Sequence, residues 1–355
     1  MKRTNREDEV KKTLVTGGAG FIGSHLVAAL LDNGYAVRVA DNLCRGSLEN
    51  LQTVMGRITF HHTDLTDYSS CIKVTSGMDY VFHLASPVGG IQFISKQNVA
   101  NLRPALIMHA NMLEASRANN VRRFLFASSA CVYYDKKSGL NAFAESDAFP
   151  ANPPTTYGWA KIAGEKLCRA YYDDYGLKTS AVRIFNSYGE HENLDPQWSH
   201  VIPSLIRKAI RYPNEDFSVF GDGSQERAFL YVRDCVEGIM RIIETIGDGS
   251  AVNLGGKELV TISSLAKDII EISKKKVPIT YDLKGPRGVN RYCANLKLLQ
   301  ERVGWVPNTP LKVGLSKTYQ WIDGKLRGNE NTNHRLLSAT PMHRIPSEPK
   351  EATVS

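Results

Sequence analysis

The sequence predicts an α/β fold built on a doubly wound parallel sheet, with a smaller substrate-binding lobe supplied by the C-terminal half of the chain. Two observations support this prediction. In the first half, short runs of β-branched and aromatic residues alternate with amphipathic helical segments, which is the pattern of βαβ units. After about Gly189 the alternation loosens into loops and short segments, as expected of a lobe over the carboxyl edge of the sheet.

The strands and helices follow from the periodicity of apolar residues. Strands are expected at Thr13–Thr16, Ala36–Ala40, Ile58–His61, Tyr80–Leu84, Arg123–Ala127 and Thr179–Ile184. Helices are expected near Ser24–Asn33, Trp159–Tyr172 and Ile202–Arg211, and short extended segments near Phe217–Phe220 and Ala251–Leu254.

The length of 355 residues and a hydrophobic content of 42% allow one large domain or two closely packed ones. We expect the first domain over residues 11–189, with a segment near 230–265 returning to it. The lobe then takes residues 190–229 and 266–325. Residues 326–355 are polar and contain several prolines, so we expect a mobile tail there.

Bulk composition argues against several classes of partner. The net charge of +8 is spread among acidic residues without a basic arm or helix, so a small polyanionic ligand is favoured over nucleic acid. Six cysteines without CxxC spacing indicate neither a metal site nor a disulfide framework, which fits a cytoplasmic location. The charged segment Met1–Glu9 does not resemble a signal peptide. No apolar run is long enough to cross a bilayer, so we expect no association with a membrane.

A glycine-rich turn follows the first predicted strand. It comprises Thr16-Gly17-Gly18-Ala19-Gly20-Phe21-Ile22-Gly23, and a helix begins at once after it. Glycines at 17, 20 and 23 allow a tight turn, close approach of a pyrophosphate to backbone N–H groups, and close packing of helix on strand. The pattern predicts a dinucleotide site of the Rossmann type, with Phe21 and Ile22 at the start of the helix.

The residues at the ends of the next strands extend this site. Asp41 ends the second strand, where a carboxylate accepts hydrogen bonds from ribose hydroxyls and repels a 2′-phosphate, so NAD is favoured, although the nearby Arg45 leaves room for NADP. Further candidate cofactor-binding residues follow the second, third and fourth strands: Asn42, Asp64, Leu65, Leu84, Ala85 and Ser86.

Three residues form a candidate catalytic group. Ser129 follows the predicted strand Arg123–Ala127, and Tyr157 with Lys161 forms a Tyr-x-x-x-Lys pattern at the start of a helix. This spacing places both side chains on one helical face, so we expect the ammonium to lower the phenol's pKa from its usual value of about 10. The tyrosinate would then take a hydroxyl proton from substrate as hydride leaves carbon, with Ser129 as a second hydrogen-bonding group and NAD as the acceptor.

With these residues in place, the chain resembles the nucleotide-sugar epimerases of the extended short-chain dehydrogenase/reductase family over roughly residues 11–325. The motifs that carry the resemblance are TGGAGFIG, SSACVY, YGWAK, RIFNSYG and FGDGSQERAFLYVRD. The resemblance implies an enzyme that binds NAD and a nucleotide-sugar, with Asn186, Arg227 and Arg291 as candidates for holding the diphosphate. It also implies a homodimer formed through two helices of each subunit, here near residues 102–118 and 159–175.

The residue two positions after Ser129 bears on the sugar chemistry. It is Cys131, and this cysteine together with the segment that begins Gly89-Gly90 resembles the GDP-mannose 3,5-epimerases of the family. In that group a cysteine and a lysine of the lobe form an acid/base pair, and the resemblance places Gly89 and Gly90 at the substrate. The position of the family's lysine falls on His200, which departs from the pattern. We expect Cys131 to act if a nearby cation lowers its pKa.

The leading hypothesis is therefore an NAD-dependent epimerase that inverts C3, C5 or both in a GDP-hexose through transient oxidation of C4. A UDP-sugar 4-epimerase, in which Cys131 is passive, is the alternative. A protein that binds NAD and a nucleotide-sugar without turnover is a third hypothesis, against which the complete set of Ser129, Tyr157 and Lys161 argues.

Overall fold

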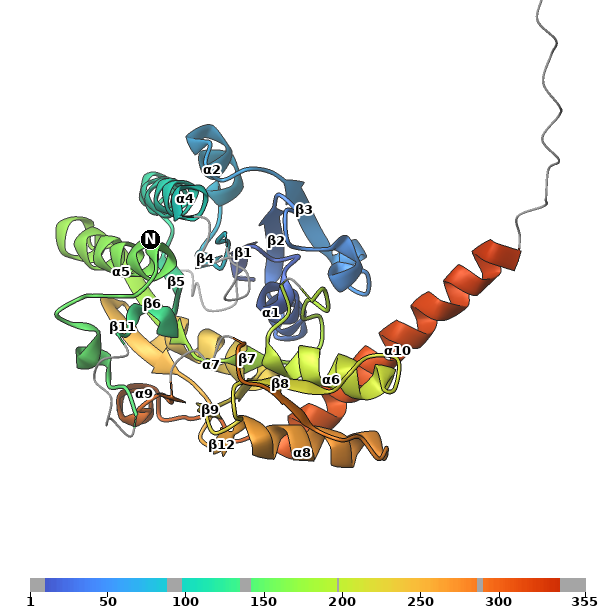
Figure 1. The fold of residues 1–355 in the computed structure, drawn as a ribbon. Helices are drawn as coiled ribbons and strands as arrows, with labels where there is room; N and C mark the ends of the chain where they lie inside the picture. The colour runs from blue at the N-terminus through green and yellow to red at the C-terminus, as the bar shows by residue number, and fades with distance from the viewer. Residues whose placement is uncertain (1–9, 88–97, 135–141, 197, 286–289, 339–355) are drawn as a thin grey trace, which may run out of the picture.

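The computed structural model describes residues 10–87, 98–134, 142–196, 198–285 and 290–338. Its centre is a sheet of parallel strands in the order β11-β6-β5-β4-β1-β2-β3 (Figure 1). The strands are β1 (Lys12–Thr16), β2 (Ala36–Asp41), β3 (Ile58–His62), β4 (Tyr80–His83), β5 (Arg123–Ser129), β6 (Lys178–Ile184) and β11 (Asp248–Leu254). The order reverses between β1 and β4, which is the point where doubly wound sheets bind ligands. The predicted fold class is confirmed.

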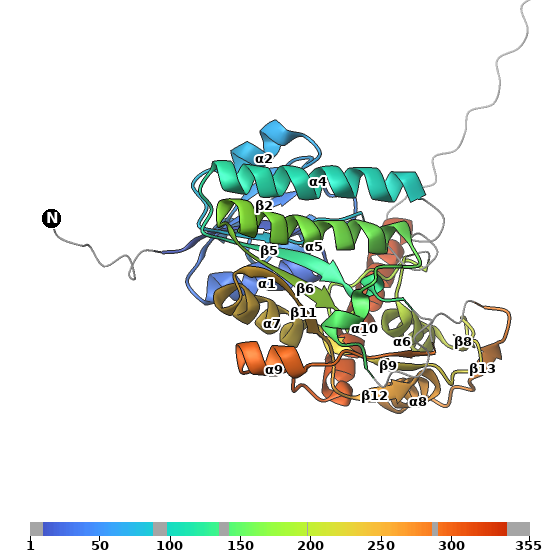
Figure 2. The same cartoon turned by 90° about the vertical axis from the view of Figure 1, so that its left-hand side faces the viewer.

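Helices cover both faces of this sheet. One face carries α1 (Phe21–Asp32), α7 (Val232–Thr245) and α9 (Lys297–Val303). The other carries α2 (Tyr68–Thr75), α4 (Asn98–Ala118) and α5 (Thr156–Tyr175), of which α4 and α5 lie side by side in Figure 2. Short 3-10 turns connect the elements: η2 (Leu48–Leu51), η3 (Met55–Arg57), η4 (Ala130–Val132) and η5 (Glu145–Ala148).

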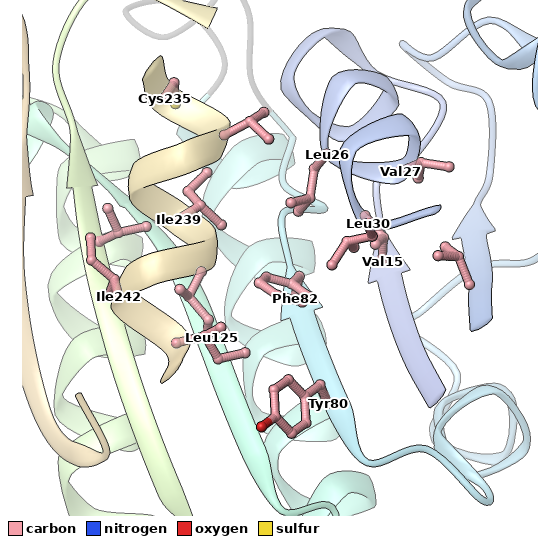
Figure 3. Close-up of a cluster of buried hydrophobic side chains, with 14 of the residues drawn as sticks. Val15, Leu26, Val27, Leu30, Tyr80, Phe82, Leu125, Cys235, Ile239 and Ile242 are labelled. Atoms are coloured by element: carbon pink, nitrogen blue, oxygen red, sulfur yellow. The ribbon is translucent and has the colours of Figure 1, made fainter. Parts of the chain in front are cut away.

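The first hydrophobic core lies between the sheet and the helices α1 and α7 (Figure 3). Leu26 and Leu30 of α1 and Ile239 of α7 are fully buried against Phe82 and Leu125 of the sheet. At about 25 cal/mol per Å² of buried apolar surface, such side chains each stabilise the fold by roughly 1.5–3 kcal/mol. This core fixes the carboxyl ends of β1 and β4 relative to the first turn of α1.

The lobe has a core of its own. It is built from α6 (Val201–Arg211), α8 (Ile262–Ser273) and the first half of α10 (Leu311–Ser338), and from short strands. The strands are β7 (Ser187–Tyr188) with β10 (Leu230–Tyr231), β8 (Ser218–Phe220) with β13 (Thr280–Asp282), and β12 (Leu259–Thr261), β9 (Glu226–Ala228) and β14 (Arg291–Tyr292) in one small sheet. The segment expected to return to the first domain supplies α7 and β11, and β11 pairs with β6.

Two expectations about the C-terminal third were wrong. Residues 297–303 were placed in the lobe, but α9 packs on the first domain, because Leu299 is fully buried in the core of the large sheet. The segment from residue 326 was expected to be a tail, but α10 runs to Ser338. Leu315 and Ile322 anchor its first half in the lobe, and no proline interrupts the helix after that half. Residues 339–355 lie outside the described part.

Across the described ranges, no helix is both long and apolar enough to span a bilayer, and no group of three or more His, Cys, Asp or Glu side chains is arranged to hold a metal ion.

Candidate active site

A cavity of about 1040 Å³ lies between the carboxyl ends of the central strands and the lobe. Most of the residues singled out in the sequence line it, although they come from segments far apart in the chain. They are Gly17, Gly20, Phe21, Ile22, Gly23, Asp41, Asn42, Asp64, Leu65, Leu84, Ala85, Ser86, Ser129, Cys131, Tyr157, Lys161, Asn186, His200 and Arg227.

Three of the singled-out residues are not placed at this cavity. Gly89 and Gly90 lie outside the described residues. Arg291 does not line the cavity, because its guanidinium is drawn to the carboxylate of Glu226 on the neighbouring strand, 2.6 Å away. Arg227 on β9, by contrast, does line the cavity.

The glycine turn between β1 and α1 shapes one end of the cavity. The α1 helix begins after Gly20 without a side chain capping its first N–H groups. A Cβ atom at Gly23 would lie 2.1 Å from the carbonyl oxygen of Gly17, so only glycine lets the helix pack this closely on the turn. Open backbone N–H groups at a helix N-terminus attract an anion. This end therefore fits the pyrophosphate of a dinucleotide.

Asp41 at the end of β2 supports the same turn. Its side chain is 7% exposed, and its oxygens accept hydrogen bonds from the backbone N–H groups of Ala19 at 3.0 Å and Leu43 at 2.8 Å. A carboxylate has further lone pairs beyond these two bonds, so Asp41 retains the capacity to accept from ribose hydroxyls. Together with the uncapped helix, this donor and acceptor set fits NAD.

Ser129, Cys131 and Tyr157 meet at the other end of the cavity. Ser129 caps the η4 turn by accepting a hydrogen bond from the N–H of Cys131 at 3.2 Å. The first turn of α5, capped by Thr155, lies against this turn: a Cβ at Gly158 would come within 2.3 Å of the carbonyl oxygen of Cys131. Because glycine stands there, Tyr157 is held close enough to Ser129 for the serine hydroxyl to act on the pKa of the phenol.

Burial dominates the protonation of these groups. It raises the pKa of Tyr157, an effect that Cys131 adds to and the Ser129 hydrogen bond opposes. Burial also lowers the pKa of Lys161 to about 7, against the opposing charges of Cys131 and Glu165. The expectation that Lys161 lowers the pKa of Tyr157 was wrong for this arrangement. The ammonium instead donates to the carbonyl of Ala127 at 2.7 Å.

The cation considered for Cys131 is present as Lys161, but its effect does not prevail. Burial raises the pKa of this thiol, and the Ser129 hydrogen bond and the Lys161 charge do not offset it. Cys131 therefore holds its proton near neutral pH and is better suited to donate a proton than to remove one.

A buried ion pair lies directly behind the catalytic group. Arg183 on β6 is 2% exposed and donates to both carboxylate oxygens of Glu165 on α5, at 2.9 and 2.7 Å. Ser128, the neighbour of Ser129, donates to the same carboxylate at 2.5 Å. Arg183 also reaches the Tyr133 hydroxyl at 2.9 Å. The network joins α5, β5 and β6 and so fixes the position of Ser129 relative to Tyr157.

Replacing Glu165 with Ala is expected to lower the free energy of unfolding by about 3–5 kcal/mol, because it leaves the Arg183 charge buried and unpaired. Urea denaturation followed by circular dichroism measures the change. The matched control is Asp173→Ala, which breaks the half-exposed pair with Arg169 on the same helix and should cost about 0.5 kcal/mol or less. Equal losses in both variants would contradict a structural role of the buried pair.

On the lobe side, Asn186 and His200 face the cavity from different elements. The Asn186 amide donates to the carbonyl of Ala228 at 3.1 Å, which ties the loop after β6 to β9. His200 precedes α6, and its Nδ1 lies 2.5 Å from a carboxylate oxygen of Glu192. Glu192 also lines the cavity and was not expected from the sequence. Neither its loop position nor its spacing to His200 gave a recognisable signal.

Contacts between the first domain and the lobe also close the cofactor end of the cavity, and no local sequence motif predicts them. The guanidinium of Arg45 lies 3.6 Å from the centre of the Trp198 ring, and both residues line the cavity. Lys325 of α10 pairs with Glu49 close by. These contacts join the loop after β2 to the lobe, and a sequence pattern cannot anticipate them because each partner belongs to a different domain.

Comparisons with known proteins agree with this geometry. Residues 13–255 match the model of the NAD dependent epimerase/dehydratase family. The chain is 35% identical to GDP-mannose 3,5-epimerase of Arabidopsis thaliana over 88% of this chain and 82% of that protein. It also resembles two crystal structures: UDP-glucose 4-epimerase of Thermotoga maritima with UDP-glucose (TM-score 0.82, 29% identity, 89% and 99% of the two chains), and UDP-glucuronic acid 4-epimerase of Bacillus cereus with UDP-glucuronic acid and NAD (TM-score 0.77, 28% identity, 88% and 99%).

These similarities confirm the predicted resemblance to nucleotide-sugar epimerases, the predicted enzyme class and the predicted cofactor NAD. They do not single out one base or sugar, since similar proteins act on GDP- and UDP-sugars.

Proposed function

Because this chain belongs to the NAD dependent epimerase/dehydratase family, we propose that it inverts C3, C5 or both in a GDP-hexose after transient oxidation of C4. The observation that carries the proposal is the position of Cys131. Its thiol stands beside Ser129 and Tyr157 at the wall of the same cavity. A thiol that could donate a proton to a ring carbon thus lies next to the tyrosine that would exchange the proton of the C4 hydroxyl. The similarity to a GDP-mannose 3,5-epimerase also supports inversion at C3 or C5 of a GDP-hexose.

The residues divide the reaction into two tasks. Tyr157, next to Ser129, would take the proton of the C4 hydroxyl as tyrosinate, a form that burial disfavours here and that the positive charge of bound NAD would favour, and would later return it. Gly17, Gly20, Gly23 and Asp41 would hold NAD, which supplies the hydride acceptor when bound. A ketone at C4 acidifies the protons on C3 and C5, so a base and an acid on opposite ring faces can invert either carbon. We assign Cys131 to the acid, because its proton is retained. Asn186 and Arg227 would hold the diphosphate.

The proposal is tested by incubating the purified protein with a panel of GDP- and UDP-hexoses in deuterated water and following carbon-bound deuterium by NMR. Deuterium at C3 or C5 of a GDP-hexose is the expected result. NAD should remain bound and be regenerated in each cycle. Net consumption of NAD in proportion to product would contradict an epimerase and indicate a dehydrogenase.

A UDP-sugar 4-epimerase is the second candidate, favoured by the similarity to UDP-sugar 4-epimerase structures over almost their whole length. In that case Tyr157 and Ser129 suffice and Cys131 is passive. Inversion at C4 of a UDP-sugar without deuterium at C3 or C5 would identify it. The absence of turnover with every sugar would leave a protein that binds NAD and nucleotide-sugar only. Since the acid role needs a free thiol, we place the reaction in a reducing compartment such as the cytoplasm.

We also propose a homodimer formed through α4 and α5, which lie side by side on one face of the molecule (Figure 2). Val99, Trp159 and Tyr175 expose 76%, 44% and 60% of their surface on these helices, more than apolar groups of a monomer usually do. Sedimentation at micromolar concentration should give twice the monomer mass. Trp159→Glu should shift the equilibrium toward monomer, and a monomeric mass for the parent protein would contradict the proposal.

A further inference from the structure

Glu192 is a buried carboxylate that has no role in the proton transfers assigned to Tyr157 and Cys131. Its side chain is 3% exposed although it lies in the loop that follows β7 and lines the cavity. One oxygen, Oε1, lies 2.5 Å from Nδ1 of His200. The other, Oε2, is buried and has no hydrogen-bond partner among the residues that the structure describes. Leaving a carboxylate oxygen buried and unpaired costs stability, so a purely structural origin does not explain it.

His200 is placed differently. Its side chain is 58% exposed, and it opens α6 without capping the helix through its ring. Because Nδ1 faces Glu192, that nitrogen carries the proton when the imidazole is neutral, and Nε2 is then the basic atom. A base at the cavity wall with access to water can accept a proton from a substrate and release it to solvent.

We propose that Glu192 and His200 act as a dyad, in which His200 removes the ring proton and Glu192 holds the imidazole in the active tautomer and stabilises the imidazolium that forms. The proposal rests on the function proposed above. Here His200 is the catalytic residue and Glu192 is a positioning residue. The unpaired Oε2 remains available to accept a hydrogen bond from a hydroxyl of the bound sugar.

The step balances without a further reagent. The C–H bond beside the C4 ketone breaks, its proton moves to Nε2 of His200, and the electron pair delocalises into the carbonyl as an enolate. The Cys131 thiol then gives its proton to the same carbon from the other face. The proton on His200 leaves to water, and water returns one to the Cys131 thiolate. Solvent deuterium therefore enters the inverted sugar through Cys131.

The electrostatics of His200 agree with the role of a base. Partial loss of hydration around the ring would by itself lower its pKa, but the hydrogen bond and charge of Glu192 outweigh this and raise it, and Glu192 is the titratable group found to act on it. A higher pKa makes the neutral imidazole a stronger base. The rate of exchange should thus rise as pH increases through the pKa of His200, where the imidazole loses its proton.

Glu192→Gln tests the dyad, since it keeps the size of the side chain and removes the charge. NMR titration of the His200 ring should show a lower pKa in the variant than in the parent protein, and the pH at which deuterium exchange begins should move down with it. The maximal exchange rate should fall about tenfold or more, and that of His200→Gln about a hundredfold. The double variant should be no slower than His200→Gln alone. Glu190→Gln, in the same loop but bound to Tyr231, is the matched control and should change neither quantity.

An unchanged His200 pKa in Glu192→Gln would overturn the dyad, whatever the activity. Losses that multiply in the double variant would overturn it as well, because they indicate two independent roles. If no sugar of the panel exchanges with the parent protein, the proposed function fails and the role of His200 as a base fails with it. Even then, a lower His200 pKa in Glu192→Gln would show that Glu192 and His200 interact. Failure of the proposed function can therefore be told apart from failure of the dyad.

Discussion

Replacing Tyr157 with Phe is expected to lower kcat by about 10⁴ while leaving NAD bound, because the ring remains and the hydroxyl that exchanges the substrate's C4 proton is lost. Tyr157 is 8% exposed and lies beside Ser129 at the cavity wall, and phenylalanine has no group that can take its part in proton transfer. Without oxidation at C4 the ring protons stay non-acidic. The variant should therefore lose both the transient absorbance of reduced nicotinamide and all deuterium incorporation.

Tyr175→Phe provides the matched control, since it makes the same chemical change at an exposed position of the same helix. It should retain the parent rate. Near-normal turnover of Tyr157→Phe would remove this residue from the reaction, and loss of bound NAD would indicate that its hydroxyl serves binding instead.

Regular periodicity made the first domain predictable. Each strand from β1 to β6 lies within a residue or two of its expected place, because buried parallel strands demand runs of β-branched and aromatic residues. The glycine turn was equally predictable, since any side chain at position 23 would clash with the carbonyl oxygen of Gly17. Such positions restrict the residue type by local sterics, and local sterics can be read from one sequence.

The lobe was less predictable for physical reasons. Strands of two or three residues, such as β7 and β14, are too short to show a period, and they exist because partners distant in sequence pair with them. The protonation states of the catalytic residues could not be predicted from the sequence for a similar reason. The spacing of Tyr157 and Lys161 indicated a shared face, but burial sets their pKa values, and burial depends on the packing of β5 and α5. Arg45 gained its partner Trp198 only through the closure of the lobe over the sheet, and Glu192 pairs with His200 through an irregular loop that has no period.

The second large effect is expected at Cys131. Cys131→Ala should leave NAD binding and transient oxidation of C4 intact, because the change removes only the thiol and leaves Ser129 and Tyr157 in place. Inverted product that carries deuterium at C3 or C5 should fall by about three orders of magnitude, as expected for one positioned acid. The two measurements separate the tasks: absorbance of reduced nicotinamide in a single turnover reports C4 oxidation, and NMR reports carbon-bound deuterium.

A second cysteine, Cys293, provides the matched control for Cys131→Ala. Cys293→Ala removes a thiol that is also half-buried but does not line the cavity, so it should exchange at the parent rate. If Cys131→Ala loses the nicotinamide signal as well, the thiol supports Tyr157 rather than the ring carbons, since the pKa of that phenol depends on its surroundings, Cys131 included. If it exchanges as fast as the parent protein, inversion at C3 or C5 does not pass through Cys131. The reaction then reduces to chemistry at C4, for which Ser129 and Tyr157 are sufficient.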